Sequence, residues 1–101
     1  MIKHFVFWEL LDEAEGRPRA ENARVIKEAL ESMGEIPGVL RLEVSYNAKV
    51  DALSREVDLM LYSEHESWEA LQAYQAHPEH KKVITVVRPL RKNRWAVDFE
   101  V

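Results

Sequence analysis

Cysteine is absent from this chain of 101 residues. Its absence excludes disulfide bonds, thiolate nucleophiles and cysteine-based zinc sites, because each of them requires a cysteine sulfur. Glycine is scarce, with three residues, and no glycine-rich loop that would cradle a phosphate group is present. The chain also lacks a recognisable serine, histidine and aspartate arrangement of the kind found in hydrolases.

Long apolar runs and an excess of basic residues are missing as well. No apolar run approaches the roughly 20 residues that a membrane-spanning helix requires. Residues 1–5 lack the basic-then-apolar layout of a signal peptide, so we expect a cytoplasmic protein with no membrane partner. The net charge of −4 disfavours a nucleic-acid partner, and we interpret the basic stretch from Arg88 to Arg94 as a solvated loop.

The composition that remains is that of a globular protein. Hydrophobic residues make up 47% of the chain and charged residues 32%, which is unlike a disordered segment. A chain of this length buries roughly two-thirds of its unfolded surface on folding, enough for one modest core. We therefore expect a single domain over residues 1–101.

Hydrophobic periodicity predicts six main segments of secondary structure. Alternation and β-branched or aromatic content predict strands over residues 2–11, 39–46, 56–63 and 94–101. Helical spacing predicts helices over residues 19–33 and 68–76, with a further helical piece that begins at Pro78 and stops near Pro89. The order strand, helix, strand, strand, helix, strand predicts an α+β, ferredoxin-like βαββαβ protomer.

The expected sheet has two apolar faces but helices on only one side. Phe5 and Phe7 lie on the second face of the first strand, and Met60 and Tyr62 extend that face on the third. For the last strand, we expect one set of side chains to face inward (Trp95, Val97, Phe99 and Val101) and the other to face outward (Arg94, Asp98 and Glu100). A large apolar face is rarely left in water, so we expect a homodimer in which two sheets pack face to face around a two-fold axis.

Several segments resemble the stress-responsive dimeric α/β-barrel family (Dabb). They are the opening IKHFV (residues 2–6), YSEHES (62–67), AYQAHPEH (73–80) and the closing VDFEV (97–101). The block Tyr-x-x-His-Pro-x-His from Tyr74 to His80 is the most specific of them, and the resemblance covers nearly the whole chain. It implies two ferredoxin-like protomers joined through their sheets into a dimeric α/β barrel.

The resemblance also implies which residues take part in chemistry. In a plant member of the family that cyclises a polyketide thioester without a cofactor, the catalytic tyrosine matches Tyr74 and the catalytic histidine matches His80. A histidine near its cavity matches His4. This chain differs in the cavity wall, where Trp8 replaces a smaller aliphatic residue.

The residue types at these positions suit acid–base chemistry. Histidine is the side chain best able to move protons near neutral pH, and a tyrosine O–H beside it stabilises a developing enolate oxygen. Together, His80 as base and Tyr74 as donor would remove a proton next to a carbonyl group with no metal and no cofactor. The competing interpretation is that Tyr74 only packs in the core.

Other side chains are candidates for binding a ligand. His4, Val6 and Trp8 share one face of the first strand and point toward the helices, and we add Leu61 and His77 as further ligand-binding candidates. For His4, a hydrogen-bonded core histidine is the more common alternative. For His77, which directly precedes Pro78, a helix cap is the favoured alternative.

A metal site at His77 and His80 is a weaker hypothesis. Two imidazoles three residues apart are too few ligands for a catalytic zinc, which usually has three protein ligands. Glu66, Glu79 or His65 would have to add the third. We therefore expect no metal.

The sequence leaves more than one function open. The leading hypothesis is a small dimeric protein that binds an apolar or aromatic carbonyl compound between sheet and helices. Its reaction, if it has one, would be that of a cofactor-free cyclase, lyase or isomerase. The alternatives are a non-catalytic stress-response or structural dimer, favoured if Trp8 and Trp68 fill the core, and a cofactor-free monooxygenase of the same fold, because fold alone does not determine function.

Overall fold

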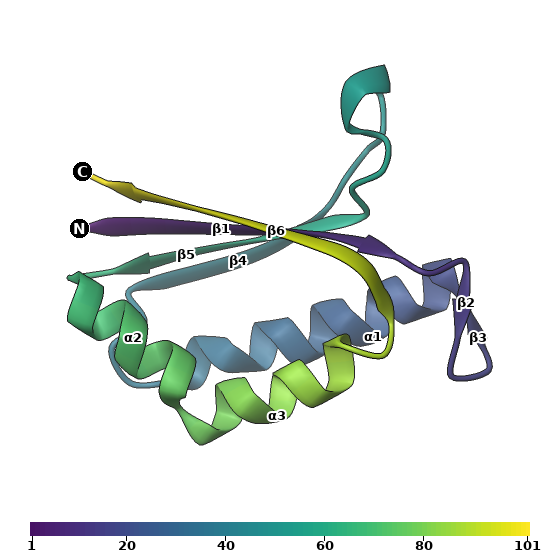
Figure 1. The fold of residues 1–101 in the computed structure, drawn as a ribbon. Coiled ribbons are helices and arrows are strands. Elements are labelled where there is room, and N and C mark those ends of the chain that lie inside the picture. Colours follow the sequence, from purple (N-terminus) through teal and green to yellow (C-terminus); the bar gives the residue numbers. More distant parts are fainter.

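A four-stranded antiparallel sheet with helices on a single side forms the body of the protein (Figure 1), and residues 13–14 and 17–18 pair in a separate two-stranded sheet. The computed structural model describes all residues from 1 to 101. Its strands are β1 (Ile2–Leu10), β2 (Glu13–Ala14), β3 (Arg17–Pro18), β4 (Arg41–Tyr46), β5 (Leu59–His65) and β6 (Arg91–Glu100). Its α-helices are α1 (Arg19–Glu31), α2 (Trp68–Ala76) and α3 (Pro78–Val87), and short 3₁₀ helices cover Ser32–Glu35 and Ala52–Ser54.

The order of the strands confirms the ferredoxin-like fold. The sheet runs β4-β5-β1-β6, and each neighbouring pair is antiparallel. Helix α1 connects β1 to β4, and α2 with α3 connects β5 to β6, so both connections cross the same face of the sheet (Figure 1). The two chain ends lie beside each other, because β1 and β6 are neighbours. None of the helices has the length and apolar character needed to cross a membrane.

The core lies between the sheet and the helices. Ile26 and Leu30 of α1 are almost fully buried, as are Leu59 and Leu61 of β5. Burying one such side chain contributes about 1.5–3 kcal/mol, so this face of β1 and β5 holds the helices in place. Helix α2 begins and ends as predicted, because Ser67 accepts a hydrogen bond from the N–H of Ala70 and Pro78 prevents the helix from continuing.

The loop between β4 and β5 is anchored by the buried carboxylate of Asp58. Its Oδ2 accepts a hydrogen bond from the backbone N–H of Leu10 at 2.7 Å, and its Oδ1 contacts the Lys49 ammonium at 2.5 Å. A buried carboxylate is stable only with such partners. The anchor closes the loop, and β5 starts at the next residue, Leu59, instead of at the predicted Glu56.

The face of the sheet away from the helices is apolar and uncovered in the single chain. We call it the reverse face and define it by Phe5, Phe7, Met60, Tyr62, Trp95, Val97 and Phe99. The Phe5 ring centroid lies 4.9 Å from that of Tyr62 and 5.9 Å from that of Phe99, so the aromatic rings pack side by side across three strands. They form one continuous apolar surface.

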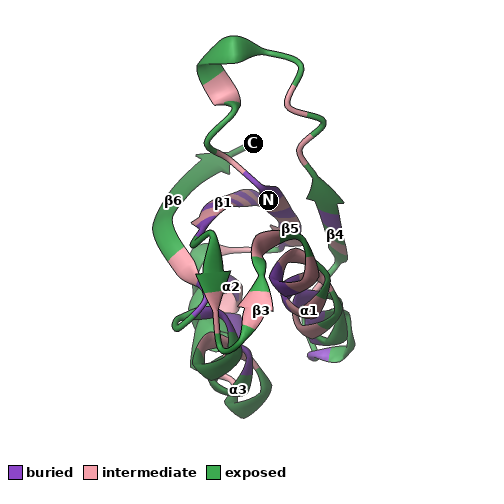
Figure 2. Ribbon diagram, turned by 90° about the vertical axis from the view of Figure 1, so that its right-hand side faces the viewer, coloured by how far each residue is buried: buried purple, intermediate pink, exposed green.

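The predicted orientation of the last strand is wrong. Trp95, Val97 and Phe99 lie on the reverse face and are between 42% and 52% exposed, and β6 is exposed along most of its length (Figure 2). Arg94 and Asp98 point toward the helices instead, because they pair with Trp8 and His4 of β1. Alternation along a strand separates two faces but does not say which of them the helices cover.

Candidate functional site

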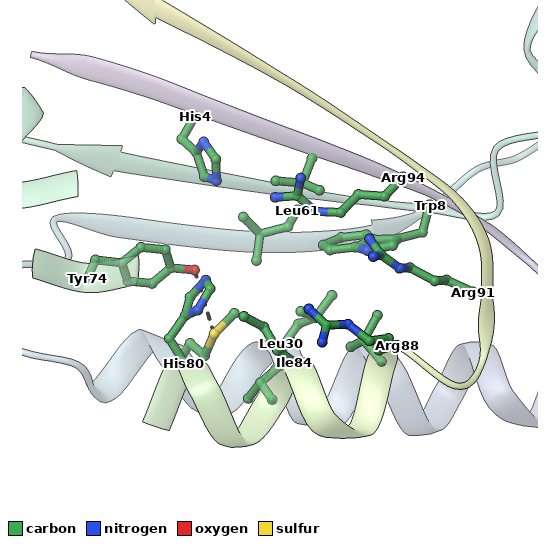
Figure 3. A pocket seen from close by; sticks show the side chains of 14 residues that line it. His4, Trp8, Leu30, Leu61, Tyr74, His80, Ile84, Arg88, Arg91 and Arg94 are labelled. Carbon is green, nitrogen blue, oxygen red and sulfur yellow. Dashed lines mark hydrogen bonds between the residues drawn. The ribbon is translucent and has the colours of Figure 1, made fainter. Parts of the chain in front are cut away.

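A cavity of about 190 Å³ lies between the sheet and the helices (Figure 3). Fourteen residues line it, and nine of them are hydrophobic. Pockets for drug-sized ligands usually measure about 300–1,000 Å³, so this cavity suits a smaller molecule. Trp68 does not line it and is 43% exposed. The core is therefore not filled by Trp8 and Trp68 together, which was the condition for favouring a purely structural protein.

Most of the site residues suggested by the sequence meet at this cavity. Its lining includes His4, Val6 and Trp8 from β1, Leu61 from β5, Tyr74 from α2 and His80 from α3. The strand residues come from the helix-facing side of the sheet, and the break at Pro78 turns α3 so that His80 faces Tyr74 (Figure 3).

His77, the remaining ligand-binding candidate, is the exception, because the structure does not place it at this cavity. Its Nδ1 accepts a hydrogen bond from the backbone N–H of Glu79 at 3.1 Å, so the side chain caps α3 and does not line the cavity. Such a cap satisfies one of the free N–H groups at a helix start. The protein contains no group of three or more histidine or acidic side chains arranged to hold a metal ion.

Tyr74 presents a phenol group at one end of the cavity. Its ring is 1% exposed, and its O–H points to the Met33 sulfur at 3.7 Å, a weak acceptor (Figure 3). Burial raises the pKa of Tyr74 well above its ordinary value. The group therefore stays protonated at neutral pH, with an O–H that a better acceptor on a ligand would attract.

His80 lies against that phenol. The two ring centroids are 4.9 Å apart and the rings meet edge to face. Its Nδ1 is buried and has no hydrogen-bond partner. Burial lowers the pKa of His80, and the nearby His4 and Arg94 lower it further. The imidazole is thus neutral at pH 7, which is the form able to accept a proton.

His4 is held by a carboxylate that the sequence did not point to. Its Nδ1 lies 2.5 Å from Oδ1 of Asp98 on the neighbouring strand β6. Because a carboxylate only accepts hydrogen bonds, Nδ1 carries the ring proton and donates a hydrogen bond to Asp98, and Nε2 is the nitrogen left for a ligand. The sequence contained a signal for Asp98, because it alternates with the apolar residues of β6. That signal points to the cavity only when the face of β6 that the helices cover is known.

His65 is a buried side chain that packs against Tyr74. It is 0% exposed, its ring centroid lies 4.7 Å from that of Tyr74, and its Nε2 is 2.8 Å from Ser63 Oγ. Burial lowers the pKa of His65 to about 4, and His4 adds to the effect while Asp98 opposes it. His65 does not line the cavity, so it supports the position of Tyr74.

Three arginines also line the cavity, namely Arg88, Arg91 and Arg94. The interpretation of residues 88–94 as a solvated loop is wrong for residues 91–94, which form part of a strand, although Arg88 and Arg94 are exposed as well as lining the cavity. Arg88 follows the last turn of α3, whereas Arg91 and Arg94 belong to β6, which was expected to begin only at Arg94.

Comparison with known families agrees with this architecture. The model of the stress responsive A/B barrel domain family, Dabb, matches residues 2–101. The chain belongs to this family. No curated protein matches this Dabb protein.

The solved structures that resemble this Dabb protein share its fold over almost the whole chain. A dimeric protein of ferredoxin-like fold from Bacteroides fragilis is 26% identical, with a TM-score of 0.84 over 99% of this chain and 95% of its own. A dimeric ferredoxin-like protein from Thermobifida fusca is 20% identical, with a TM-score of 0.84 over 99% and 90% of the two chains. A Nitrosomonas europaea protein, provisionally named an antibiotic biosynthesis monooxygenase, is 16% identical, with a TM-score of 0.73 over 100% and 98%. At such identities, the last two show the fold alone.

Proposed function

We propose that this Dabb protein binds a small apolar or aromatic carbonyl compound in its cavity and removes a proton next to the carbonyl group without a cofactor. One observation supports this function above all others. A protonated phenol, Tyr74, and a neutral imidazole, His80, lie against each other in a largely hydrophobic cavity. Their protonation states are those that a hydrogen-bond donor and a general base require.

The proposed step uses the two groups together. His80 takes the proton from the carbon next to the carbonyl, so that a C–H bond breaks and an N–H bond forms. The electron pair moves onto the carbonyl oxygen, which becomes an enolate and accepts a hydrogen bond from the Tyr74 O–H. The apolar walls keep water away and strengthen that hydrogen bond. Return of the proton to another carbon gives an isomerase, and attack of the enolate on a second carbonyl gives a cyclase.

His4 orients the ligand in this proposal. Its contact with Asp98 fixes the ring, and its free Nε2 faces the same cavity as Tyr74 and His80. The centroids of the His4 and Tyr74 rings lie 6.4 Å apart. A carbonyl compound between them would thus meet polar groups from the sheet as well as from the helices.

We further propose that the protein acts as a homodimer through the reverse face. Phe99 is 52% exposed and Trp95 43% in the single chain, and a second copy would remove both from water. The loop between β4 and β5 projects on the same side of the sheet (Figure 1), with Val50 85% and Leu53 93% exposed. Dimerisation of the Bacteroides fragilis structure, at 26% identity, supports this assembly.

Hydrogen–deuterium exchange tests the chemical step without knowledge of the natural substrate. 1-Phenylpropan-2-one, a small aromatic ketone, is incubated with the protein in D₂O, and NMR follows the loss of the protons next to its carbonyl group. We expect exchange faster than in buffer. His80→Gln should abolish the acceleration and Tyr74→Phe should reduce it by about tenfold or more, the usual range for such groups.

His77→Gln is the matched control, because it alters a histidine three residues away that faces outside the cavity. Its exchange rate should equal that of the wild type. Circular dichroism establishes that each variant is folded. Exchange at the buffer rate in the wild type, or an unchanged rate in folded His80→Gln, would contradict the proposed function.

A further inference from the structure

Three positive charges converge on one part of the cavity. Arg88 follows the end of α3, and Arg91 lies at the start of β6. Arg94 lies three residues after Arg91, and a shift in the register of β6 on β1 between Glu9 and Leu10 places both arginines opposite helix-facing residues of β1. None of the three forms an ion pair with an acidic side chain, although eight such pairs are present elsewhere in the protein. The three guanidinium groups are free to bind another anion.

Arg88 and Arg91 occupy a different part of the cavity from the phenol and the imidazole, whereas Arg94 is near enough to lower the pKa of His80. In Figure 3, Tyr74 and His80 lie at one end, Arg88 and Arg91 lie at the other, and Arg94 reaches in from β6 between the two. Hydrophobic side chains, among them Leu30, line the cavity between the two ends. A ligand that occupies the cavity thus meets acid–base groups at one end and positive charge at the other.

The charge at this end is not balanced by the cavity itself. The fourteen lining residues include three arginines and no aspartate or glutamate, although the whole chain has a net charge of −4. Burial lowers the pKa of Arg94, the charge of Arg91 lowers it further, and Asp98 opposes the shift. Holding like charges together costs free energy, and an anion placed among them would recover it.

Surface arginines that merely face water are a common alternative, but two features separate these three from that case. They come from two elements that meet at a cavity, and Arg91 is half-buried there. Arg94 also points to the helix side of the sheet, because it pairs with the buried Trp8 of β1. Guanidinium groups bind carboxylate and phosphate oxygens through charge-assisted hydrogen bonds.

We propose that Arg88, Arg91 and Arg94 bind an oxyanion on the ligand, so that the cavity binds an anionic carbonyl compound more tightly than a neutral one. The oxyanion is the carboxylate of an oxo acid or a phosphate group, and the apolar part of the ligand spans the middle of the cavity. The assignment of the carbonyl end to Tyr74 and His80 rests on the proposed function. The assignment of the anion to the arginines does not.

Calorimetry with three matched probes tests the charge of the ligand. 3-Phenylpropanoate and 3-phenylpropanamide have the same size and differ in charge, and benzyl phosphate replaces the carboxylate by a phosphate. We expect the carboxylate or the phosphate to bind at least about tenfold more tightly than the amide, as charge-assisted hydrogen bonds imply. Whichever of the two anions binds more tightly identifies the kind of oxyanion.

Two variants assign the preference to the arginines. Arg91→Gln and Arg94→Gln should each remove most of the advantage of the anionic probe while leaving the affinity for the amide unchanged. Arg55→Gln makes the same change of charge at an exposed position outside the cavity and should keep the preference. Equal binding of the three probes by the wild type, or an intact preference in folded Arg91→Gln and Arg94→Gln, would overturn the proposal.

His80→Gln distinguishes this proposal from the proposed function. The variant should lose deuterium exchange but keep the tighter binding of the anionic probe, since the imidazole lies at the other end of the cavity. Anion preference without any exchange in the wild type supports the arginine site and contradicts the acid–base step. Exchange without anion preference supports the acid–base step and contradicts the arginine site.

Discussion

His4 and Asp98 are separated by 94 positions in the sequence, yet His4 Nδ1 lies 2.5 Å from Asp98 Oδ1. The antiparallel pairing of β1 with β6 brings them together, since the two residues are direct partners in the register. His4 is 2% exposed, so the carboxylate supplies the hydrogen-bond partner that a polar group in a buried ring needs. It also determines which ring nitrogen is left free of the carboxylate.

The first prediction concerns this pair. In Asp98→Asn, the amide can donate as well as accept, so His4 is no longer held with its proton on Nδ1. We expect the exchange rate with 1-phenylpropan-2-one to fall by about tenfold, the lower end of the usual cost of losing a partner that orients a histidine. Nitrogen-15 NMR of the His4 ring should show the change of tautomer, whereas Glu100→Gln, two residues further along β6, should alter neither measurement.

The second prediction is the pH dependence of exchange. The folded protein lowers the pKa of His80 below its ordinary value of 6.5, because of burial and of His4 and Arg94 nearby. The base is therefore mostly neutral at pH 7, and we expect the rate to fall in acid with a midpoint below pH 6.5. Arg94→Gln should move the midpoint upward, since one positive charge near the imidazole is lost. A midpoint above 6.5 in the wild type would contradict this assignment.

The order of helices and strands was predictable from the sequence because apolar residues recur in each segment with the spacing of a helix or of a strand. The start and end of α2 matched the structure to the residue, since the cap at Ser67 and the break at Pro78 are local signals. The start of β5 was not predictable, because it depends on the contacts of Asp58 with Leu10 and Lys49. The contact with Leu10 joins residues that are 48 positions apart in the sequence.

The candidate site was predictable only in part, for a related reason. Tyr74 and His80 are close in sequence and belong to one motif, so their meeting could be anticipated. Asp98 and Arg94 enter the site through the register of β6 on β1, which alternation alone does not give. The apolar residues of β6 were predicted to face the helices because they are apolar. They lie on the reverse face instead, which no helix of the same chain covers.

The third prediction is a loss of stability in acid that is due to His65. Its pKa is lowered from 6.5 to about 4 in the folded protein, so the unfolded chain binds a proton more readily. The contribution of the neutral ring to stability is complete above pH 6.5 and is lost as the pH falls toward 4. A shift of this size corresponds to about 3 kcal/mol. Urea unfolding from pH 7 to pH 4 should show a shallower decline in His65→Phe than in the wild type, and equal declines would rule His65 out.

The fourth prediction concerns the buried carboxylate of Asp58, which is 5% exposed and lies 2.5 Å from Lys49 Nζ and 3.8 Å from Arg19. Asp58→Asn removes the charge that both cations face, and we expect the free energy of unfolding to fall by about 2 kcal/mol. Asp12→Asn is the control, because Asp12 pairs with the same Arg19 but is 97% exposed. Exposed pairs contribute about 0–1 kcal/mol, so its unfolding midpoint in urea should barely move.

The last prediction tests the reverse face as the dimer interface. Phe5 lies at its centre, with its ring against those of Phe7, Tyr62 and Phe99. A carboxylate in that position would have to be buried without a partner on dimerisation, which costs several kcal/mol per protomer. Phe5→Glu should therefore halve the mass measured by light scattering at micromolar concentration, whereas Val86→Glu, on the exposed side of α3, should leave the dimer intact. A wild-type protein with the mass of one chain, or a Phe5→Glu variant that stays dimeric, would show that the reverse face is not what joins the two copies.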